Sequence, residues 1–382
     1  MKKRSKLFIV ALSMISSLGF AQTNGSTNVN TAQRILDAGQ NNRVTIGGYG
    51  EVHYNQPDKD NGQMDVHRFV MFLGYKFNEK TQFITEIEYE HVKELYVEQA
   101  FLNYSLADNI SFRAGLMLVP MGIINEYHEP TTFNGVERPN VDKSIVPSTW
   151  REIGAGINGR WDDISLKYQA YVFNGFISVN GEKFLGGKHG VRNGRQKGAE
   201  STFNNANFSV KLDYYGIQGL KLGLAGYAGR TQATEYENRN DNAHAVGLKM
   251  IGLDARYILQ RFSARGQFVK TYIEGADAYN TQYTSDLGDE MQGWYLEAAY
   301  DLLPLDNPQD LTAFVRYEDY NTHHAVSGIT ANMGYDRTDT TVGLSYMIAP
   351  GVVVKGDHQW FDNAAEGSVV KKQFNFGVGC WF

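Results

Sequence analysis

Hydrophobic and polar residues alternate along most of the chain after Arg43. In the first run, Val44 and Ile46 share one parity, and Thr45 and Glu51 take the other. Successive side chains of a strand point to opposite faces, so this alternation predicts strands with one apolar and one polar face. The last run has the same form, and its apolar positions are Phe374, Phe376, Val378, Cys380 and Phe382.

The alternating runs repeat about sixteen times, and most are close to the ~10 residues expected for strands of a membrane barrel. The segments between them differ in length according to their order. Even-numbered connections are short turns, such as residues 78–80 and 349–351, whereas odd-numbered connections are mostly long and polar. In an up-and-down barrel these two sets lie at opposite ends. A soluble all-β protein, the alternative fold, gives no reason for this sorting.

Aromatic residues at the ends of many runs favour the membrane barrel, because aromatic girdles mark both of its interfaces. In lipid every backbone polar group must pair, which requires the strands to close on themselves. We therefore predict an all-β fold for residues 43–382, a transmembrane antiparallel up-and-down β-barrel of about 16 strands with long external loops and short periplasmic turns. The aromatic positions are Tyr54, Tyr75, Phe77, Tyr104, Trp150, Trp161, Trp294, Tyr300, Tyr346, Trp360, Trp381 and Phe382.

One long segment, residues 120–149, has no strand or helix period. It contains four of the eight prolines and lies between the fifth and sixth runs. A loop of this length in a compact chain is usually functional or disordered. Its candidate functional residues are Glu126, His128, Glu129, Glu137, Arg138, Asp142 and Lys143.

The N-terminus predicts export. Four basic residues precede a short apolar stretch that ends in small residues, which is typical of a cleaved secretory signal peptide at residues 1–21. Its removal takes away four positive charges and changes the formal net charge from −6 to −10. Residues 22–42 are expected to form a periplasmic lead-in with a short helix around residues 32–38.

Composition excludes several other classes of protein. No further stretch approaches about 18 consecutive apolar residues, so no transmembrane helix is predicted. Mean hydropathy is −0.39 although aromatic residues make up 13% of the chain, a combination that suits amphipathic strands. The single cysteine, Cys380, excludes an intramolecular disulfide framework, and no basic run points to nucleic acid.

The polar parity of the runs predicts the residues that line the lumen. Sixteen strands enclose an aqueous channel, whereas eight are filled by side chains. The charged positions allow two interpretations: a basic arc facing an acidic wall selects solutes by charge, or the charges pair with one another and keep the lumen wet. These positions are Glu51, Arg68, Glu86, Glu88, Glu90, Arg113, Lys167, Lys211, Lys221, Arg256, Arg265, Glu297, Arg316, Glu318, Lys355 and Asp357.

Several stretches resemble the phosphate-selective porin O/P family of outer-membrane porins. They are residues 97–104 (VEQAFLNY), 113–125 (RAGLMLVPMGIIN), 146–157 (VPSTWREIGAGI) and the terminal aromatic strand. The resemblance implies a sixteen-stranded homotrimeric porin whose third external loop, here residues 120–149, folds inward and narrows the pore. It also implies that Phe382 is the C-terminal signal that the barrel-assembly machinery reads.

Phosphate selectivity is not carried over from this resemblance. Family members that select phosphate have a constriction lined by Lys and Arg, whereas the loop of this chain carries four acidic residues against Arg138 and Lys143. We therefore predict a bacterial outer-membrane porin for passive diffusion of small hydrophilic solutes or ions. The alternatives are a substrate-specific channel with a saturable lumen site for an anion or small nutrient, and a barrel enzyme acting on lipid or peptide.

The sequence offers little support for catalysis. No nucleophile is tied by spacing to His128 and Glu129, and His323 and His324 have no partner at metal-ligand spacing, so we predict no enzyme, no metal and no cofactor. Expected partners are outer-membrane lipid and, in a second long loop, lipopolysaccharide or another anionic partner; the alternative is a solvated loop. The basic residues of that loop are Lys183, Lys188, Arg192, Arg195 and Lys197.

Overall fold

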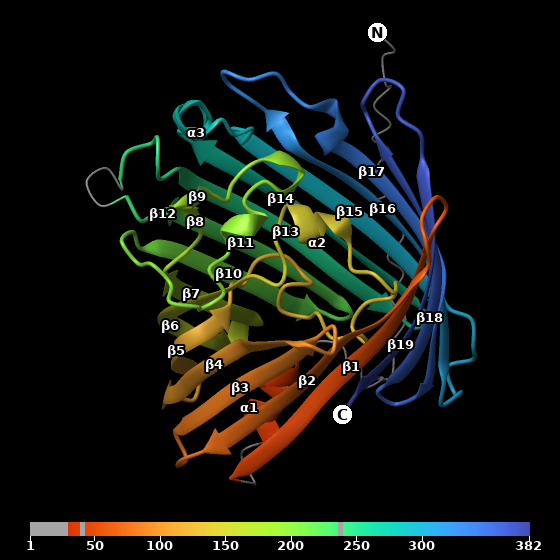
Figure 1. Ribbon diagram of the computed structural model, residues 1–382. Coiled ribbons are helices and arrows are strands. Elements are labelled where there is room, and N and C mark those ends of the chain that lie inside the picture. Colours follow the sequence, from red (N-terminus) through yellow and green to blue (C-terminus); the bar gives the residue numbers. More distant parts are fainter. Residues whose placement is uncertain (1–29, 39–42, 236–239) are drawn as a thin grey trace.

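The computed structural model describes residues 30–38, 43–235 and 240–382, so the predicted signal peptide lies outside the described residues. Sixteen antiparallel strands form one closed barrel, which confirms the predicted all-β class and strand number (Figure 1). The strands are β1 (Val44–Pro57), β2 (Gln63–Lys76), β3 (Thr81–Glu90), β4 (Glu94–Ala107), β5 (Ile110–Leu118), β6 (Arg151–Trp161), β7 (Leu166–Phe173), β10 (Asn207–Ile217), β11 (Leu220–Arg230), β13 (Gly247–Leu259), β14 (Phe262–Glu274), β15 (Glu290–Asp301), β16 (Asp310–Ala325), β17 (Asp336–Ala349), β18 (Val352–Asn363) and β19 (Lys371–Trp381).

The barrel closes where the first strand meets the last. β1 pairs with β19, and Gly48 and Phe382 exchange two backbone hydrogen bonds of 3.0 and 2.9 Å. Each strand of the barrel otherwise pairs with its neighbours in barrel order, which leaves the barrel without a free edge. The terminal Phe382 therefore belongs structurally to the seam of the barrel.

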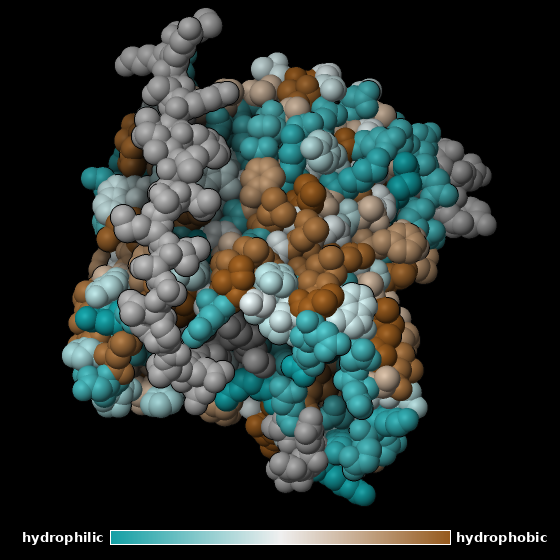
Figure 2. Space-filling model, turned by 180° about the vertical axis from the view of Figure 1, so that it is seen from behind, coloured by the Kyte–Doolittle hydropathy of each residue, from teal (hydrophilic) through white to brown (hydrophobic). Residues whose placement is uncertain are grey.

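The predicted alternation separates an apolar outside from a polar inside. On β13, Ile251 and Leu253 are exposed on the outside, whereas Asp254 on the opposite parity is buried. In Figure 2, hydrophobic side chains occupy much of the middle of the visible face, and hydrophilic side chains gather near its upper end. Among the described residues, no helix has the length and apolar character needed to cross a membrane.

The two ends of the barrel differ as the connections predict. The short-turn end carries two-residue links such as residues 260–261, and the long-loop end carries the segments 174–206, 231–246 and 275–289. Two connections at the long-loop end are nevertheless brief, namely residues 58–62 and 91–93.

The long loops contain more regular structure than the sequence analysis expected. Segments of two different loops pair because backbone groups folded back over the barrel need partners, and they form a small sheet in the order β12-β8-β9. The added elements are β8 (Ile177–Asn180), β9 (Glu182–Lys183), β12 (Gln232–Ala233), α3 (Ala276–Tyr283), and 3-10 turns at Gly187–His189, Arg192–Gly194 and Met333–Tyr335. A further 3-10 turn, Asp162–Ile164, lies in the short connection between β6 and β7.

Two β-bulges change which residues face the lumen. In β2 the pairing with β1 shifts so that His67 is the extra residue before Arg68, and in β4 the pairing with β3 shifts next to Glu98. A bulge places two consecutive residues on one side of the sheet. Glu98 and Gln99 are accordingly both buried inside the barrel.

The segment between β5 and β6, residues 119–150, runs through the barrel interior, and we call it the inner loop. It contains α2 (Asn140–Ser144), and most of its residues are buried. α1 (Thr31–Ala38) lies against the inner face of β1, β2 and β3 at the short-turn end. Ile35 fits against Gly47 and Gly74, where an added Cβ would come within 3.1 and 2.3 Å of it.

Candidate functional site

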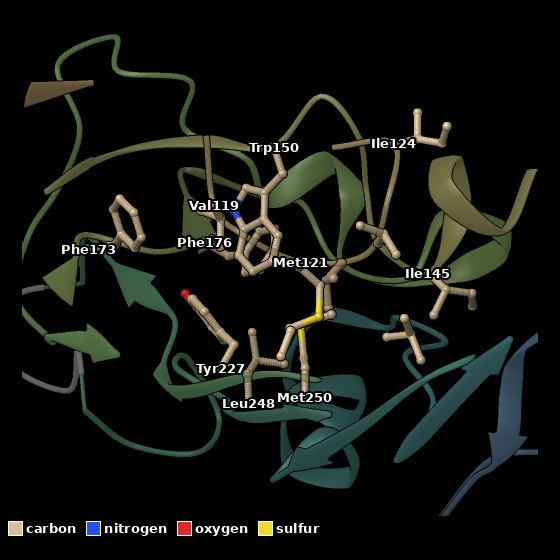
Figure 3. Close-up of a cluster of buried hydrophobic side chains, with 14 of the residues drawn as sticks. Val119, Met121, Ile124, Ile145, Trp150, Phe173, Phe176, Tyr227, Leu248 and Met250 are labelled. Atoms are coloured by element: carbon tan, nitrogen blue, oxygen red, sulfur yellow. The ribbon is translucent and has the colours of Figure 1, made fainter. Parts of the chain in front are cut away.

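The two ends of the inner loop form a dry core with one side of the barrel wall. Trp150 stacks on Phe176 with ring centroids 4.5 Å apart and meets the Tyr227 ring at 4.8 Å. Figure 3 shows these rings beside the thioether of Met121. Other members of this core are Val119, Ile124, Ile145, Phe173, Leu248 and Met250.

Trp150 corrects one of the aromatic assignments made from the sequence. It was expected in an interface girdle, but β6 begins at Arg151, so Trp150 belongs to the inner loop and is fully buried. Trp381 likewise faces inward, where the guanidinium of Arg34 from α1 lies 4.0 Å from its ring centroid. Run-end position alone does not say to which side an aromatic ring points.

Glycines in the wall make room for the inner loop. A Cβ added to Gly293 would lie 2.9 Å from Ile145, and one added to Gly379 would lie 2.6 Å from Pro130. Both contacts are shorter than packed carbon atoms allow. The wall is therefore shaped to the loop at two separate strands of the barrel, β15 and β19.

The middle of the loop is held by polar contacts to β2, β3, β4 and β10. The Arg68 guanidinium donates to the His128 carbonyl at 2.6 Å, and the His128 ring lies 3.4 Å from Glu98 and 3.6 Å from Glu86. Glu126 accepts from Lys211 at 3.0 Å. All of these side chains are buried, so each charge has a close partner of opposite sign, as buried charges require.

Side chains on the strands from β14 to β18 also form hydrogen bonds with the loop backbone. The amide of Val136 donates to Asp357 at 2.6 Å, and the amide of Val141 donates to Glu318 at 2.9 Å. The Lys355 ammonium donates to the carbonyls of Phe133 and Gly135 at 2.7 and 2.9 Å. These side chains face the lumen as the parity predicts, but they hold the loop and are buried beneath it.

Charged residues on β10, β11 and β14 to β16 pair with one another as well. Arg316 lies 2.9 Å from Glu318 and 3.4 Å from Glu297, and Arg265 lies 2.8 Å from Glu297. Lys221 lies 3.3 Å from Asp213. In this part of the lumen, opposite charges neutralise one another locally.

Beneath the inner loop, α1 contributes a further contact. The backbone amide and hydroxyl of Thr31 donate to Glu129 at 2.7 and 2.8 Å. A small cavity of about 30 Å³ remains beside α1, bordered by Arg113, Lys167 and Glu126. A larger hollow of about 330 Å³ at the short-turn end is bordered by Lys167, Lys221 and Arg256. Loop and helix together thus fill the middle of the barrel.

A cavity of about 710 Å³ remains at the long-loop end, between the inner loop and strands β1 to β4, β18 and β19. We call it the outer cavity. Carboxylates border it mainly from β1, β3 and β4, whereas most of its cations come from the inner loop, β6 and the loop 174–206. The lining carboxylates are Glu51, Glu88, Glu90, Glu94, Glu137 and Asp142, and the lining cations are Arg68, Arg138, Lys143, Arg151, Arg192, Arg195 and Lys197.

The cations of the loop 174–206 serve both the inner loop and the outer cavity. Arg195 donates to the carbonyls of Pro147 and Thr149 at 3.1 and 2.9 Å, and Arg192 donates to that of Lys143 at 2.9 Å. Burial, then the neighbouring Arg192 and Arg151, lower the pKa of Arg195, and burial followed by Arg195 lowers the pKa of Lys197. A counter-anion in the outer cavity would relieve this repulsion.

Several residues of the outer cavity were not identified from the sequence. His53, His67 and His91 border it, as does Arg151, and Glu98 lies behind it against Arg151 at 3.5 Å. The change of apolar parity between Val97 and Ala100 is a signal in the sequence for the bulge that turns Glu98 inward. His91 lies in a turn, so no periodicity could place it.

A sequence comparison identifies a curated relative. An uncharacterized protein of Aquifex aeolicus (strain VF5) is 34% identical over 332 residues, which cover 82% of this chain and 75% of the relative. This chain belongs to that protein's family. No protein-family model matches the chain, so the resemblance to phosphate-selective porins stays a prediction.

Solved structures with a similar fold are outer-membrane channels. The outer-membrane channel DcaP of Acinetobacter baumannii aligns with a TM-score of 0.59 at 10% identity, covering 89% of this chain and 97% of that one. The anion-selective porin of Comamonas acidovorans gives 0.58 at 11% identity, covering 89% and 99%. Pseudomonas putida OprB gives 0.56 at 11% identity, covering 92% and 96%. At these identities the likeness establishes the barrel fold.

Proposed function

We propose that the protein is a bacterial outer-membrane porin through which small hydrophilic solutes or ions diffuse passively. The apolar outer surface suits lipid, and the closed barrel leaves no unpaired strand edge to contact it. The long-loop end would face outward and the short-turn end the periplasm. This orientation agrees with a signal peptide at residues 1–21, which would deliver the chain for export.

The observation that carries the proposal is the inner loop. It crosses the barrel interior, is bonded to the wall on several sides, and leaves a charged cavity at one end. A loop fixed in the lumen sets the largest solute that can pass, and opposed charges along the path select by charge. In this proposal residues 126–143 form the constriction.

The assembly of the porin is part of the proposal. A homotrimer is supported by the form in which one structurally similar protein, OmpT of Vibrio cholerae, is described, namely a trimer. The exposed aromatic ring of Phe382 at the seam is available for reading by the barrel-assembly machinery. Arg192 and Arg195 bind the inner loop, and Lys197 borders the outer cavity. Any contact with lipopolysaccharide would therefore use the other two cations of that segment, Lys183 and Lys188.

Planar-bilayer recording tests the proposal directly. Purified, folded protein should insert in discrete conductance steps with a linear current–voltage relation. A reversal potential under a salt gradient then gives the preference between cations and anions. Folded protein that produces no conductance step would overturn the proposal.

A second candidate is a saturable anion site, which the crowded cations of the outer cavity favour. Seven cations border the cavity, and three of them belong to one loop. The six lining carboxylates argue against a simple phosphate pore, since they repel an anion. Concentration-dependent block of the current by inorganic phosphate, weakened in Lys197→Gln, would favour the saturable site. Current that is independent of phosphate would favour passive diffusion.

A further inference from the structure

Three side chains of metal-ligating types lie close together, and two of them border the outer cavity. The β2 bulge turns His67 inward two residues after Asp65, and the turn between β3 and β4 brings His91 beside them. The Asp65 carboxylate lies 2.5 Å from Nδ1 of His91 and 3.6 Å from Nδ1 of His67. One ligand atom from each residue lies within 4.8 Å of the others.

We propose that Asp65, His67 and His91 bind a divalent transition-metal ion, with Zn²⁺ the best match. Two imidazole nitrogens and one carboxylate oxygen suit Zn²⁺, whereas Mg²⁺ and Ca²⁺ prefer oxygen ligands alone. Three protein ligands leave a fourth position for water or a solute. Metal binding by these three residues does not depend on whether solutes cross the barrel.

The spacing of the three side chains fits such an ion with a small adjustment. Metal–ligand bonds of about 2.0–2.2 Å place tetrahedral ligands roughly 3.3–3.6 Å apart. The separation between Asp65 and His67 already has this value, while His91 must move away from Asp65 by roughly 1 Å to admit the ion. The His91 side chain is 41% exposed, so this movement meets little packing.

Neighbouring groups orient the two imidazoles. The His53 ring stacks on His67 at 4.5 Å, and both nitrogens of His53 face carboxylates, Glu51 at 3.2 Å and Glu137 at 3.3 Å. His53 therefore supports His67 and is not itself a ligand. On the other side, Glu90 lies 3.9 Å from Nε2 of His91, the nitrogen that remains free when Nδ1 binds the metal. A metal-bound histidine typically donates its free nitrogen to a carboxylate, and Glu90 is close to that position although it lies beyond hydrogen-bond distance.

The turn that carries His91 is a tight two-residue hairpin turn. His91 and Val92 have φ values of 53° and 66°, a left-handed conformation that a β-branched valine rarely adopts. His67 and His91 both border the outer cavity, so the ion would be reached from the long-loop end.

Titration calorimetry on the full-length folded barrel tests the proposal, with ZnCl₂ as the probe. Wild type should bind one Zn²⁺ per chain at this site. His67→Gln and His91→Asn should each weaken binding at least roughly tenfold, since even the partners of metal ligands contribute that much. Asn tolerates the left-handed backbone at position 91, so the variant keeps the turn.

His324→Asn is the matched control, because it removes an exposed imidazole near the C-terminal end of β16, outside the proposed site, and should leave the Zn²⁺ affinity unchanged. Co²⁺ in place of Zn²⁺ adds a spectroscopic readout: its visible absorption should be strong in wild type and lost in both site variants. Circular dichroism shows whether each variant keeps its sheet content. Equal Zn²⁺ affinity in wild type, His67→Gln and His91→Asn, or no binding to wild type, would overturn the proposal.

Discussion

The two sides of the lumen hold the inner loop by different means. On the side of β7, β11 and β13, the loop ends pack their apolar side chains around Trp150, and the interface excludes water. On the side of β1 to β4, the contacts are charged, and an open cavity of about 710 Å³ lies beside them. One side is an apolar core, and the other combines buried ion pairs with a charged cavity.

The difference shows two ways in which a loop is fixed inside a wide barrel. Apolar packing binds the inner loop to the wall and leaves no charged group that needs a partner. Charged contacts give a defined position but leave carboxylates and guanidinium groups that still need water or solute. We infer that the apolar packing on the side of β7, β11 and β13, the dry side, holds the loop in place. The side of β1 to β4 with its charged cavity, the wet side, would then provide the path for solutes.

The largest effect is expected from removing the centre of the dry side. Trp150→Ala should cost about 3–5 kcal/mol of the free energy that holds the loop, as for other buried large-to-small changes. Limited proteolysis of the folded barrel should then cleave the inner loop, which stays protected in wild type. Trp161→Ala removes the same side chain from the exposed outer face and should leave the loop protected. Equal protection in Trp150→Ala would mean that the polar contacts alone hold the loop.

A smaller effect is expected where the wall is shaped to the loop. Gly379→Leu introduces a side chain whose Cβ would lie only 2.6 Å from Pro130, and overpacking of this kind costs about 1–3 kcal/mol. Thermal unfolding monitored by the near-ultraviolet signal should shift to lower temperature. Gly226→Leu is the control, because nothing lies within 4 Å of a Cβ there. The same shift in both variants would show that the barrel, and not the loop contact, is responsible.

Changes of charge in the outer cavity test whether this cavity is part of the path for solutes. Glu90→Gln should move the reversal potential toward anion preference, and Lys197→Gln should move it toward cation preference, because each removes one charge from the same cavity. The two shifts should be small and of opposite sign. Glu86→Gln should change selectivity less, since Glu86 is buried against His128. Shifts of the same sign for the first two variants would exclude this cavity from the path.

The pH dependence should be the smallest effect. Burial and the nearby Arg195 lower the pKa of Lys197. Lys197 therefore loses its positive charge at a lower pH than an ordinary lysine, whose pKa is about 10.4. As the pH rises from neutral toward that value, anion preference should fall in wild type, and the fall should be weaker in Lys197→Gln. An identical pH profile in both proteins would contradict the role of Lys197.

Much of the barrel could be predicted because alternation is a local property of the chain. Parity correctly places Leu253 outside and Asp254 inside, and the lengths of the connections distinguish the two ends. The bulges at His67 and Glu98 depart from simple alternation. One extra residue reverses the side of the sheet to which all later residues of that strand point.

The site was less predictable because its contacts join segments distant in sequence. His128 was identified as a loop residue, but its position between Glu86 and Glu98 depends on how the loop crosses the barrel. Lys355 was expected to border water, and it instead binds two loop carbonyls. Its role depends on a hydrogen-bond partner more than two hundred residues away, which no local pattern contains.

The most direct test of the account is the single-channel conductance of a loop-deletion variant. Replacing residues 126–143 with a short Gly/Ser linker removes the polar middle of the inner loop and leaves the apolar ends in their core. Deletion of residues 365–368 at the long-loop end serves as the control and should leave conductance unchanged. We predict a clear increase in conductance for the inner-loop variant. Conductance equal to that of wild type, in correctly folded protein, would contradict the claim that this loop sets the width of the pore.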